Sequence, residues 1–300
     1  MSESVLITGG NGFIGSHLAT SLRDAGFGVV RSSADILDRE SLISELRLFN
    51  PAVVVHLAAI SHPNVCDQDR GRAESVNVFG TRNLLEAIEL AGSVRRLVFA
   101  STAQVYRPLG PDGGVLTEDS PVEPINFYAA TKLSAEDLIR HFSAKTGIES
   151  VVFRIFNHVH KTQSAQTFLG SVYRSLLAAE DFGTRIPVGN LELWRDLGSI
   201  KDLIAAFRVV CATGIPLVER YSLFNLCNGH PRRLGDLALL LAQRMGKDVI
   251  FELDKERLRP GEPRTILGSH ARATHLLGWT PVVVSNEDLI DSFLADSPIL

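Results

Sequence analysis

The most constraining feature of this chain is a glycine-rich segment that follows its first apolar run. Val5-Leu6-Ile7-Thr8 leads into Gly9-Gly10-Asn11-Gly12-Phe13-Ile14-Gly15, and a helical pattern begins near Ile14. The glycines satisfy GxGxxG at positions 10, 12 and 15 and GxxGxxG at positions 9, 12 and 15. Glycines at this spacing permit a tight turn and let a pyrophosphate approach the backbone N–H groups at a helix N-terminus. Loops are often rich in glycine, but a strand, this loop and a helix in that order predict a dinucleotide-binding unit.

The first half of the chain alternates short apolar runs with amphipathic stretches. Apolar runs near residues 5–8, 28–31, 52–57, 96–100 and 150–155 are typical of buried strands, and helical patterns near 14–25, 39–49, 75–91 and 128–145 lie between them. This alternation predicts an α/β fold, a doubly wound parallel sheet of the Rossmann type that binds ligands at the C-terminal ends of its strands.

After Asn157 the alternation of strands and helices becomes less regular. We expect residues 1–157 to form the dinucleotide-binding domain, with later segments near 191–225 returning to it. Residues 158–300 are expected to form mainly a smaller, substrate-binding lobe, because 300 residues exceed what one minimal domain needs.

Composition and charge exclude several classes of protein. With 45% hydrophobic and 21% charged residues the chain is typical of a globular protein, and a net charge of −4 disfavours a nucleic-acid binder, which concentrates basic charge. Cys66, Cys211 and Cys227 lack CxxC spacing, so we expect three buried thiols rather than disulfides or a metal site. Neither a secretory signal nor an apolar run of about 20 residues is visible, which predicts a cytoplasmic protein with no membrane partner.

The end of the second predicted strand bears on the choice between NAD and NADP. In dinucleotide-binding folds an acidic residue there binds the 2′-hydroxyl of the adenosine ribose, whereas a cation accommodates a 2′-phosphate. This strand ends in Val30-Arg31-Ser32-Ser33, and the first acid is Asp35. Arg31 and the two hydroxyls favour NADP(H). The alternative is that Arg31 is solvated and Asp35 binds the ribose, which leaves NAD(H) possible.

A tyrosine and a lysine begin the predicted helix near 128–145, in Tyr128-Ala-Ala-Thr-Lys132. A spacing of four places both on one helical face, where an ammonium lowers the pKa of a phenol and prepares it for proton exchange. Such a pair also occurs on ordinary helices, so its position after the fourth strand gives it weight. Ser101 and Thr102 end that strand, where a hydroxyl can bind a substrate oxygen; for one of the two, capping of the strand end is the alternative.

Together these motifs resemble the extended short-chain dehydrogenase/reductase family of nucleotide-sugar epimerases, dehydratases and reductases. The resemblance covers nearly the whole chain and is closest to the GDP-mannose dehydratase and GDP-4-keto-6-deoxymannose reductase branch. Besides the glycine loop, Ser101-Thr102 and Tyr128 with Lys132, it rests on His56-Leu57-Ala58-Ala59, Asn77-Val-Phe-Gly-Thr, Arg154-Ile-Phe-Asn157-His, Gly189-Asn-Leu with Arg195-Asp, Arg259-Pro-Gly-Glu and Leu277-Gly-Trp-Thr-Pro.

The resemblance implies a role for each matching residue. Thr102, Tyr128 and Lys132 would be catalytic, with Tyr128 as the acid/base and Lys132 bound to the nicotinamide ribose. The residues implied in cofactor binding are Gly9, Gly12, Phe13, Ile14, Gly15, Arg31, Ser32, Asp35, Ile36, Leu57, Ala58, Ala59, Asn77, Tyr128 and Lys132. Those implied in substrate binding are Ser101, Thr102, Asn157, Arg195 and Arg259. Guanidinium groups bind phosphates in bidentate fashion, although ordinary ion pairs are the alternative for both arginines.

The two residues after Thr102 reduce the number of candidate reactions. Ala103 and Gln104 stand where dehydratases of the family carry acidic residues, and neither transfers a proton, so dehydration is disfavoured. We expect NADPH-dependent reduction of the 4-keto group of a nucleotide-activated 6-deoxyhexose. The alternatives are a nucleotide-sugar 4-epimerase with tightly bound NAD, and a non-catalytic dinucleotide sensor, since a fold does not fix a function.

The resemblance also implies a homodimer that packs two helices per subunit, one of them beginning at Tyr128. Leu133, Leu138, Ile139 and Phe142 supply apolar surface on that helix. The alternative is that all four face the core of their own subunit.

Overall fold

A six-stranded parallel sheet forms the larger part of the molecule, in a computed structural model that describes residues 3–107, 109, 113–180, 182–214, 217–258 and 262–296. The strand order is β10-β6-β4-β3-β1-β2. From β1 the chain adds β2 on one side and the later strands on the other, so the order of connection reverses between β1 and β3. A doubly wound sheet has its ligand crevice at such a reversal. The predicted α/β fold class is therefore confirmed. The strands are β1 (Ser4–Thr8), β2 (Gly28–Arg31), β3 (Val53–His56), β4 (Arg96–Thr102), β6 (Glu149–Ile155) and β10 (Tyr221–Leu226).

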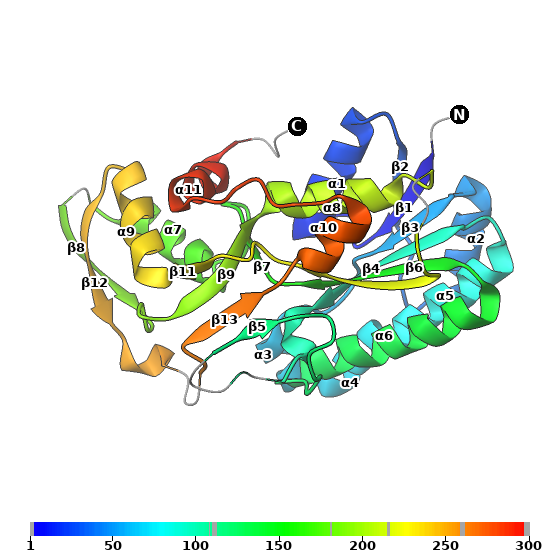
Figure 1. The fold of residues 1–300 in the computed structure, drawn as a ribbon, viewed down its shortest axis with the longest axis horizontal. Coiled ribbons are helices and arrows are strands. Elements are labelled where there is room, and N and C mark those ends of the chain that lie inside the picture. The colour runs from blue at the N-terminus through cyan, green and yellow to red at the C-terminus, as the bar shows by residue number, and fades with distance from the viewer. Residues whose placement is uncertain are drawn as a thin grey trace.

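Helices cover both faces of this sheet (Figure 1). Successive side chains point to opposite faces, so Val53 and Val55 pack beneath α1 and α8, whereas Val54 packs beneath α2, α5 and α6. Both faces are buried, which explains why the strands read as continuous apolar runs. The bounds are α1 (Phe13–Asp24), α2 (Arg39–Phe49), α5 (Gly80–Ala91), α6 (Phe127–Thr146) and α8 (Ile200–Cys211).

One predicted helix differs from its observed form. In place of a single helix over residues 75–91, the chain forms α4 (Arg70–Glu74), a π-helical turn over Ser75–Phe79 and then α5. Thr81, in the first turn of α5, donates to the carbonyl oxygen of Asn77 in the π-helical turn at 2.7 Å. Periodicity does not reveal such a turn, which is common at functional sites because it redirects one side chain.

A smaller lobe follows, with its own sheets and its own core. One sheet has the order β11-β9-β13-β5, with β7 paired to β9, and β8 pairs with β12 separately. Side chains such as Leu176, Leu237 and Phe293 fill the lobe's core. The bounds are β5 (Val115–Leu116), β7 (Asn157–Val159), β8 (Phe182–Val188), β9 (Trp194–Ser199), β11 (Pro231–Arg233), β12 (Asp248–Leu253), β13 (Thr265–Gly268), α7 (Phe168–Ala178), α9 (Leu234–Arg244) and α11 (Asn286–Leu294). Two further helices, α3 (Pro63–Gln68) and α10 (Ala271–Leu277), pack against the larger part.

The segment near 191–225 is divided between the two parts. Strand β9 belongs to the sheet of the lobe, whereas β10 pairs with β6 in the large sheet and α8 packs against that sheet.

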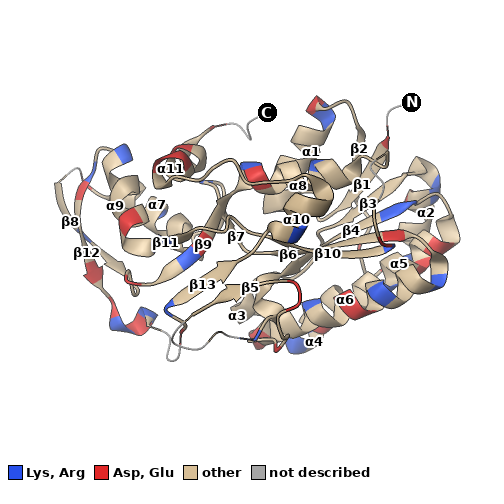
Figure 2. Ribbon diagram, in the orientation of Figure 1, with Lys and Arg blue, Asp and Glu red and all other residues tan. Residues whose placement is uncertain are grey.

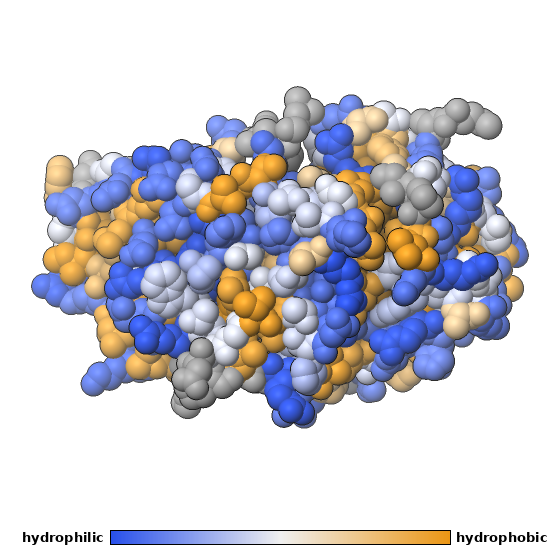
Figure 3. Space-filling model, viewed as in Figure 1, coloured by the Kyte–Doolittle hydropathy of each residue, from blue (hydrophilic) through white to orange (hydrophobic). Residues whose placement is uncertain are grey.

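Apolar side chains also reach the surface at the far end of the lobe, over β8 and β12, where Phe182 and Leu253 are exposed (Figure 3).

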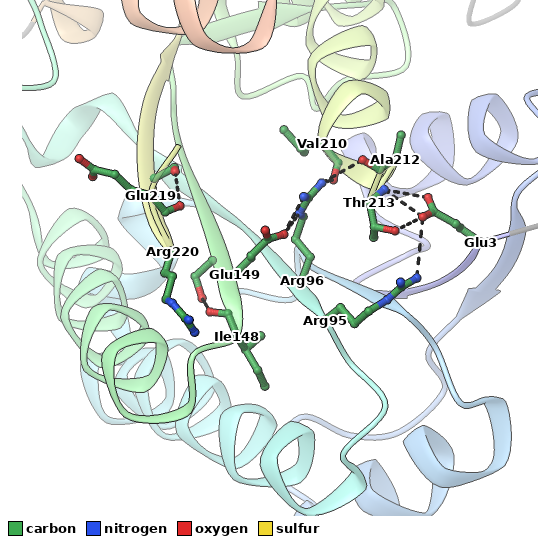
Figure 4. Close-up of polar contacts among 12 residues, drawn as sticks. Glu3, Arg95, Arg96, Ile148, Glu149, Val210, Ala212, Thr213, Glu219 and Arg220 are labelled. Atoms are coloured by element: carbon green, nitrogen blue, oxygen red, sulfur yellow. Dashed lines mark hydrogen bonds and ion pairs between the residues drawn. The ribbon is translucent and has the colours of Figure 1, made fainter. Parts of the chain in front are cut away.

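Polar contacts close the edge of the large sheet where its strands begin (Figure 4). The fully buried Arg96 pairs with Glu149, with 2.6 Å between Nη2 and Oε2. Its Nη1 donates to the carbonyl oxygens of Val210 and Ala212 at 2.8 and 3.0 Å, where α8 ends. A cation at this place satisfies terminal carbonyls and complements the helix dipole. Arg96 therefore joins α8 to the sheet at the edge opposite the glycine loop.

The helix beginning near Tyr128 offers less apolar surface than expected. Ile139 and Phe142 lie in the core beneath α6, and Leu133 and Leu138 pack against core clusters. Lys and Arg alternate with Asp and Glu along the outer surfaces of α5 and α6 (Figure 2). Ile139 and Phe142 therefore belong to the core of their own subunit, which was the alternative, whereas Leu133 and Leu138 are half-buried, so the dimer surface on this helix stays a prediction.

The cysteines lie as the sequence predicts: Cys66, Cys211 and Cys227 are all buried and unpaired. Across the described part of the chain, every helix is too short or too polar to span a membrane.

Candidate active site

The glycine loop packs tightly at the reversal point of the sheet. Gly9 has φ +67, and a Cβ there would lie 2.7 Å from the backbone nitrogen of Ala58, which follows β3. A Cβ on Gly15 would lie 2.4 Å from the carbonyl oxygen of Gly9. Only glycine fits at these two positions. No side chain caps α1 at Gly12, so the helix N-terminus, where Phe13 and Ile14 begin the first turn, suits a pyrophosphate.

A buried histidine holds β1 and β3 together beneath this loop. The ring nitrogens of His56 form hydrogen bonds with the hydroxyls of Thr8 at 2.8 Å and Thr81 at 3.0 Å. Burial lowers the pKa of His56 to about 3, so the ring is neutral. Leu57 then donates its N–H to the carbonyl oxygen of Thr8 at 3.1 Å, which sets Leu57 and Ala58 beside the loop.

Asn77, expected to contact the cofactor, ties the segment after β3 to α6. Its Oδ1 accepts from the N–H of Ile60 at 2.8 Å, and its Nδ2 donates to the Ile60 carbonyl and to Thr131 Oγ1, both at 3.0 Å. Thr131 lies between Tyr128 and Lys132 in the sequence and donates to the carbonyl of Tyr128 at 2.7 Å. Asn77 is thus a positioning residue, which fixes Ala59 and its neighbours relative to the helix that carries the tyrosine and lysine.

Tyr128 and Lys132 are both buried, with 9% and 3% of their surfaces exposed. Burial raises the pKa of Tyr128, and burial lowers the pKa of Lys132 to about 7 against the opposing effect of Glu136. We expected the lysine to lower the pKa of the phenol. The pKa of Tyr128 instead rises, chiefly because burial in a low dielectric penalises the phenolate. Tyr128 is therefore a neutral phenol with a proton to donate, and the Nζ of Lys132 lies 4.1 Å from the ring centre of Phe99.

The two hydroxyls that end β4 point to opposite sides. Ser101 donates to the buried carboxylate of Glu136, which also forms an ion pair with Arg154 at 2.7 Å. The expected role of Ser101 in substrate binding is thus not supported, because its hydroxyl faces the core. Thr102 Oγ1 accepts from the N–H of Gln104 at 3.2 Å, so it caps the turn after the strand. Within the described part of the chain, the hydroxyl hydrogen of Thr102 has no acceptor and can be donated to a ligand.

Gln104 has a role that the sequence did not reveal. Its Oε1 accepts from Asn126 Nδ2 at 2.6 Å, and Asn126 caps α6 by accepting the N–H of Ala129 at 2.8 Å. This contact joins the segment after β4 to the helix turn that carries Tyr128. An Asn just before a helix is a recognisable cap signal, but its partner is not.

Arg31 lies directly against the glycine loop. A Cβ on Gly10 would lie 2.8 Å from Arg31 Cγ, and Arg31 Nη1 donates to Asn11 Oδ1 at 3.4 Å. The Nε of Arg31 is buried and has no hydrogen-bond partner among the described residues. A donor left free beside a phosphate-binding loop suits an anionic ligand. Ser32 differs from the expectation, because its hydroxyl already donates to Glu45.

Asp35 and Ile36 stabilise the turn before α2. Asp35 Oδ1 accepts from the N–H of Leu37 at 2.9 Å, while Ile36 is buried and packs against Gly80. Asp35 is exposed and remains within reach of solvent. Of this pair, both implied in cofactor binding, Asp35 has a side chain exposed to a ligand, whereas the side chain of Ile36 belongs to the core.

The other residues expected to bind substrate differ in how exposed they are. Asn157 is exposed at the start of β7, just beyond β6. Arg195 is 7% exposed, and its Nη2 pairs with Glu262 at 2.6 Å. Its Nη1 donates to the carbonyls of Trp194, Pro263 and Arg264. Arg195 thus forms the internal ion pair that was the alternative to phosphate binding. Arg259 lies outside the described residues.

Among the described residues, no group of His, Cys, Asp and Glu side chains is arranged to hold a metal ion.

Comparisons with known proteins give consistent matches. The family described as the NAD dependent epimerase/dehydratase family matches residues 5–222. A GDP-6-deoxy-D-mannose reductase of Pseudomonas aeruginosa is 28% identical, covering 96% of this chain and 95% of that protein. A UDP-glucose 4-epimerase of Corynebacterium glutamicum is also 28% identical, covering 92% and 90%. The solved structure of RMD from Pseudomonas aeruginosa complexed with NADPH has a TM-score of 0.87 at 26% identity and covers 98% of both chains.

Proposed function

Because the chain belongs to the NAD dependent epimerase/dehydratase family, we propose that it is an NADPH-dependent reductase of the 4-keto group of a nucleotide-activated 6-deoxyhexose. The observation that carries the proposal is the buried, protonated Tyr128 on the same helix as Lys132. A reductase needs such an acid in its resting state, because the substrate oxygen takes up a proton as the carbonyl is reduced. The similarity to a GDP-6-deoxy-D-mannose reductase over most of both chains supports the same reaction.

The residues around the glycine loop fit a nicotinamide dinucleotide. Gly9, Gly12 and Gly15 leave room for a pyrophosphate at the N-terminus of α1, and the free donor of Arg31 favours a 2′-phosphate. Lys132 would hold the nicotinamide ribose. When bound, the dinucleotide supplies the hydride. The NADPH complex of a structural relative agrees with NADP(H). NAD(H) stays possible, because the structure of MoeE5 in complex with UDP-glucuronic acid contains NAD. That structure has a TM-score of 0.83 at 26% identity, and the match covers 96% of this chain and 98% of that chain.

The protein's own contribution is a proton and its placement. Tyr128 donates its phenolic proton to the carbonyl oxygen, and the ammonium of Lys132 stabilises the phenolate that results. Thr102 offers its hydroxyl hydrogen to the same oxygen. Ala103 and Gln104 cannot transfer a proton, and Gln104 is bound to Asn126, so the two positions where dehydratases of the family carry acids do not support elimination of water.

A 4-epimerase is the second candidate, since several relatives are UDP-glucose 4-epimerases. An epimerase would use the same Tyr128 and Lys132 to remove and return a hydrogen at C4. The two candidates differ in their use of cofactor. A reductase consumes one NADPH for each product, whereas an epimerase with tightly held NAD turns over without any added.

The test is a purified enzyme assayed with GDP-4-keto-6-deoxymannose and NADPH, and separately with UDP-glucose and no added cofactor. We expect stoichiometric NADPH oxidation only in the first assay. Tyr128→Phe should lower kcat by about 10²–10⁴-fold with cofactor affinity nearly unchanged. Tyr221→Phe, at the start of β10 on the opposite edge of the sheet, is the matched control and should keep wild-type activity. Near-normal turnover of Tyr128→Phe would refute the assigned mechanism.

We further propose that the lobe contributes to substrate binding and that the protein is a cytoplasmic homodimer. The three buried, unpaired cysteines agree with a reducing compartment. The homodimer rests on the family resemblance alone, and sedimentation at micromolar concentration tests it.

A further inference from the structure

The donors at the end of β2 are already satisfied by a carboxylate of the protein itself. Glu45, on α2, accepts from the hydroxyl of Ser32 through Oε2. Its Oε1 accepts from the N–H of Ser33 at 2.8 Å and from the hydroxyl of Ser33 at 3.2 Å. Three donors thus converge on one partly buried carboxylate. A group of hydroxyl and N–H donors of this kind is an anion-binding arrangement, and here Glu45 is the anion.

This arrangement lies where a dinucleotide-binding fold reads the 2′ position of the adenosine ribose. Arg31 ends β2 and packs on Gly10, so the end of this strand adjoins the pyrophosphate loop. The N–H of Ser32 donates to the carbonyl oxygen of Ile7 at 2.9 Å, which continues the pairing of β2 with β1. Arg31 contacts Asn11 there, and no ion pair between Arg31 and Glu45 occurs among the described residues. The end of β2 therefore has a guanidinium on one residue and a carboxylate bound to the next two.

We infer that Glu45 is a cofactor-selectivity residue, whose carboxylate competes with the 2′-phosphate of NADP(H) for the donors of Ser32 and Ser33. A 2′-hydroxyl finds an acceptor in this carboxylate, whereas a 2′-phosphate meets a like charge and donors that are already occupied. Arg31 has the opposite effect, because its guanidinium attracts the phosphate. The preference between the two cofactors is thus set by the balance of Arg31 against Glu45. This inference rests on the proposed cofactor site.

The experiment measures the dissociation constants of NAD⁺ and NADP⁺ by calorimetry for wild type, Glu45→Gln and Glu45→Ala. Each variant removes one negative charge beside the phosphate, so the ratio Kd(NAD⁺)/Kd(NADP⁺) should rise about tenfold or more in both. Glu40→Gln is the matched control, because Glu40 lies on the same helix and is exposed. Its ratio should change less than about twofold. Arg31→Ala should lower the ratio by about tenfold or more.

The outcomes separate this inference from the proposed function. An unchanged ratio in Glu45→Gln and Glu45→Ala overturns the selectivity role. Equally weaker binding of NAD⁺ and NADP⁺ also overturns it, because Glu45 would then only stabilise the turn. Thermal unfolding checks that the variants are folded. Failure of the wild type to bind either dinucleotide would instead refute the proposed function. Binding with a ratio that responds to Glu45, but without reduction of a 4-keto sugar, would keep the inference and reject the reaction.

Discussion

The buried pair of Glu136 and Arg154 offers a quantitative test of how the active-site elements are held together. Arg154 Nη2 lies 2.7 Å from Glu136 Oε2, and Arg154 Nε donates to both carboxylate oxygens at 3.1 and 3.2 Å. The two side chains are 4% and 0% exposed. The guanidinium also lies 4.7 Å from the ring centre of Tyr106. The pair therefore joins α6, which carries Tyr128, to β6 in an environment without solvent.

Removing one partner leaves the other as an unpaired buried charge. Such a change costs about 3–5 kcal/mol, a large part of the 5–15 kcal/mol typical of a folded domain. With an unfolding entropy of about 2.1 cal/mol/K per residue over 300 residues, this cost lowers Tm by about 5–8 °C. We expect this for Glu136→Leu and for Arg154→Met. The double variant removes both charges and should cost far less than the two single variants together, with a coupling energy of about 3 kcal/mol or more.

The assay is urea unfolding of the wild type, the two single variants and the double variant, followed by circular dichroism. Arg140 and Asp137 form an exposed pair at 3.5 Å on the same helix and provide the control cycle. Their coupling should stay below about 0.5 kcal/mol, because exposed pairs are screened by solvent. Additive costs at Glu136 and Arg154, or a wild-type midpoint for either single variant, would refute the assignment of a buried structural ion pair.

Two further predictions concern Lys132 and the glycine loop. Glu136 raises the pKa of Lys132, which burial sets at about 7, so Glu136→Gln should move the Lys132-linked limb of the kcat/KM profile to lower pH. Lys132→Met should abolish that limb, and a limb unchanged in both variants contradicts its assignment. A Cβ on Gly15 would lie 2.4 Å from the carbonyl of Gly9, so Gly15→Ala should weaken dinucleotide binding by about tenfold or more. Gly71→Ala is the control and should bind the dinucleotide normally, because a Cβ there would have a single neighbour within 4 Å, at 3.9 Å. Equal dinucleotide affinities of Gly15→Ala and Gly71→Ala in calorimetry would contradict the tight packing at Gly15.

The sequence alone determined the features whose requirements are local. Gly15 is needed because a Cβ there would meet atoms of the same loop, and Gly9 because its backbone has a positive φ. Apolar periodicity identified the strands and helices that make up the doubly wound sheet. The spacing of Tyr128 and Lys132 likewise placed both on one helix. These inferences succeed because each depends on a few consecutive residues.

Only the tertiary structure decided which partner each polar side chain has. Ser101 and Thr102 are adjacent, yet one faces Glu136 in the core and the other caps a turn, because neighbouring side chains of a strand point to opposite faces. Arg195 meets Glu262, 67 residues away, and spacing along the chain carries no signal for such a contact. Burial likewise reversed the expected pKa shift of Tyr128, since desolvation depends on everything packed around a group rather than on its neighbour in the motif.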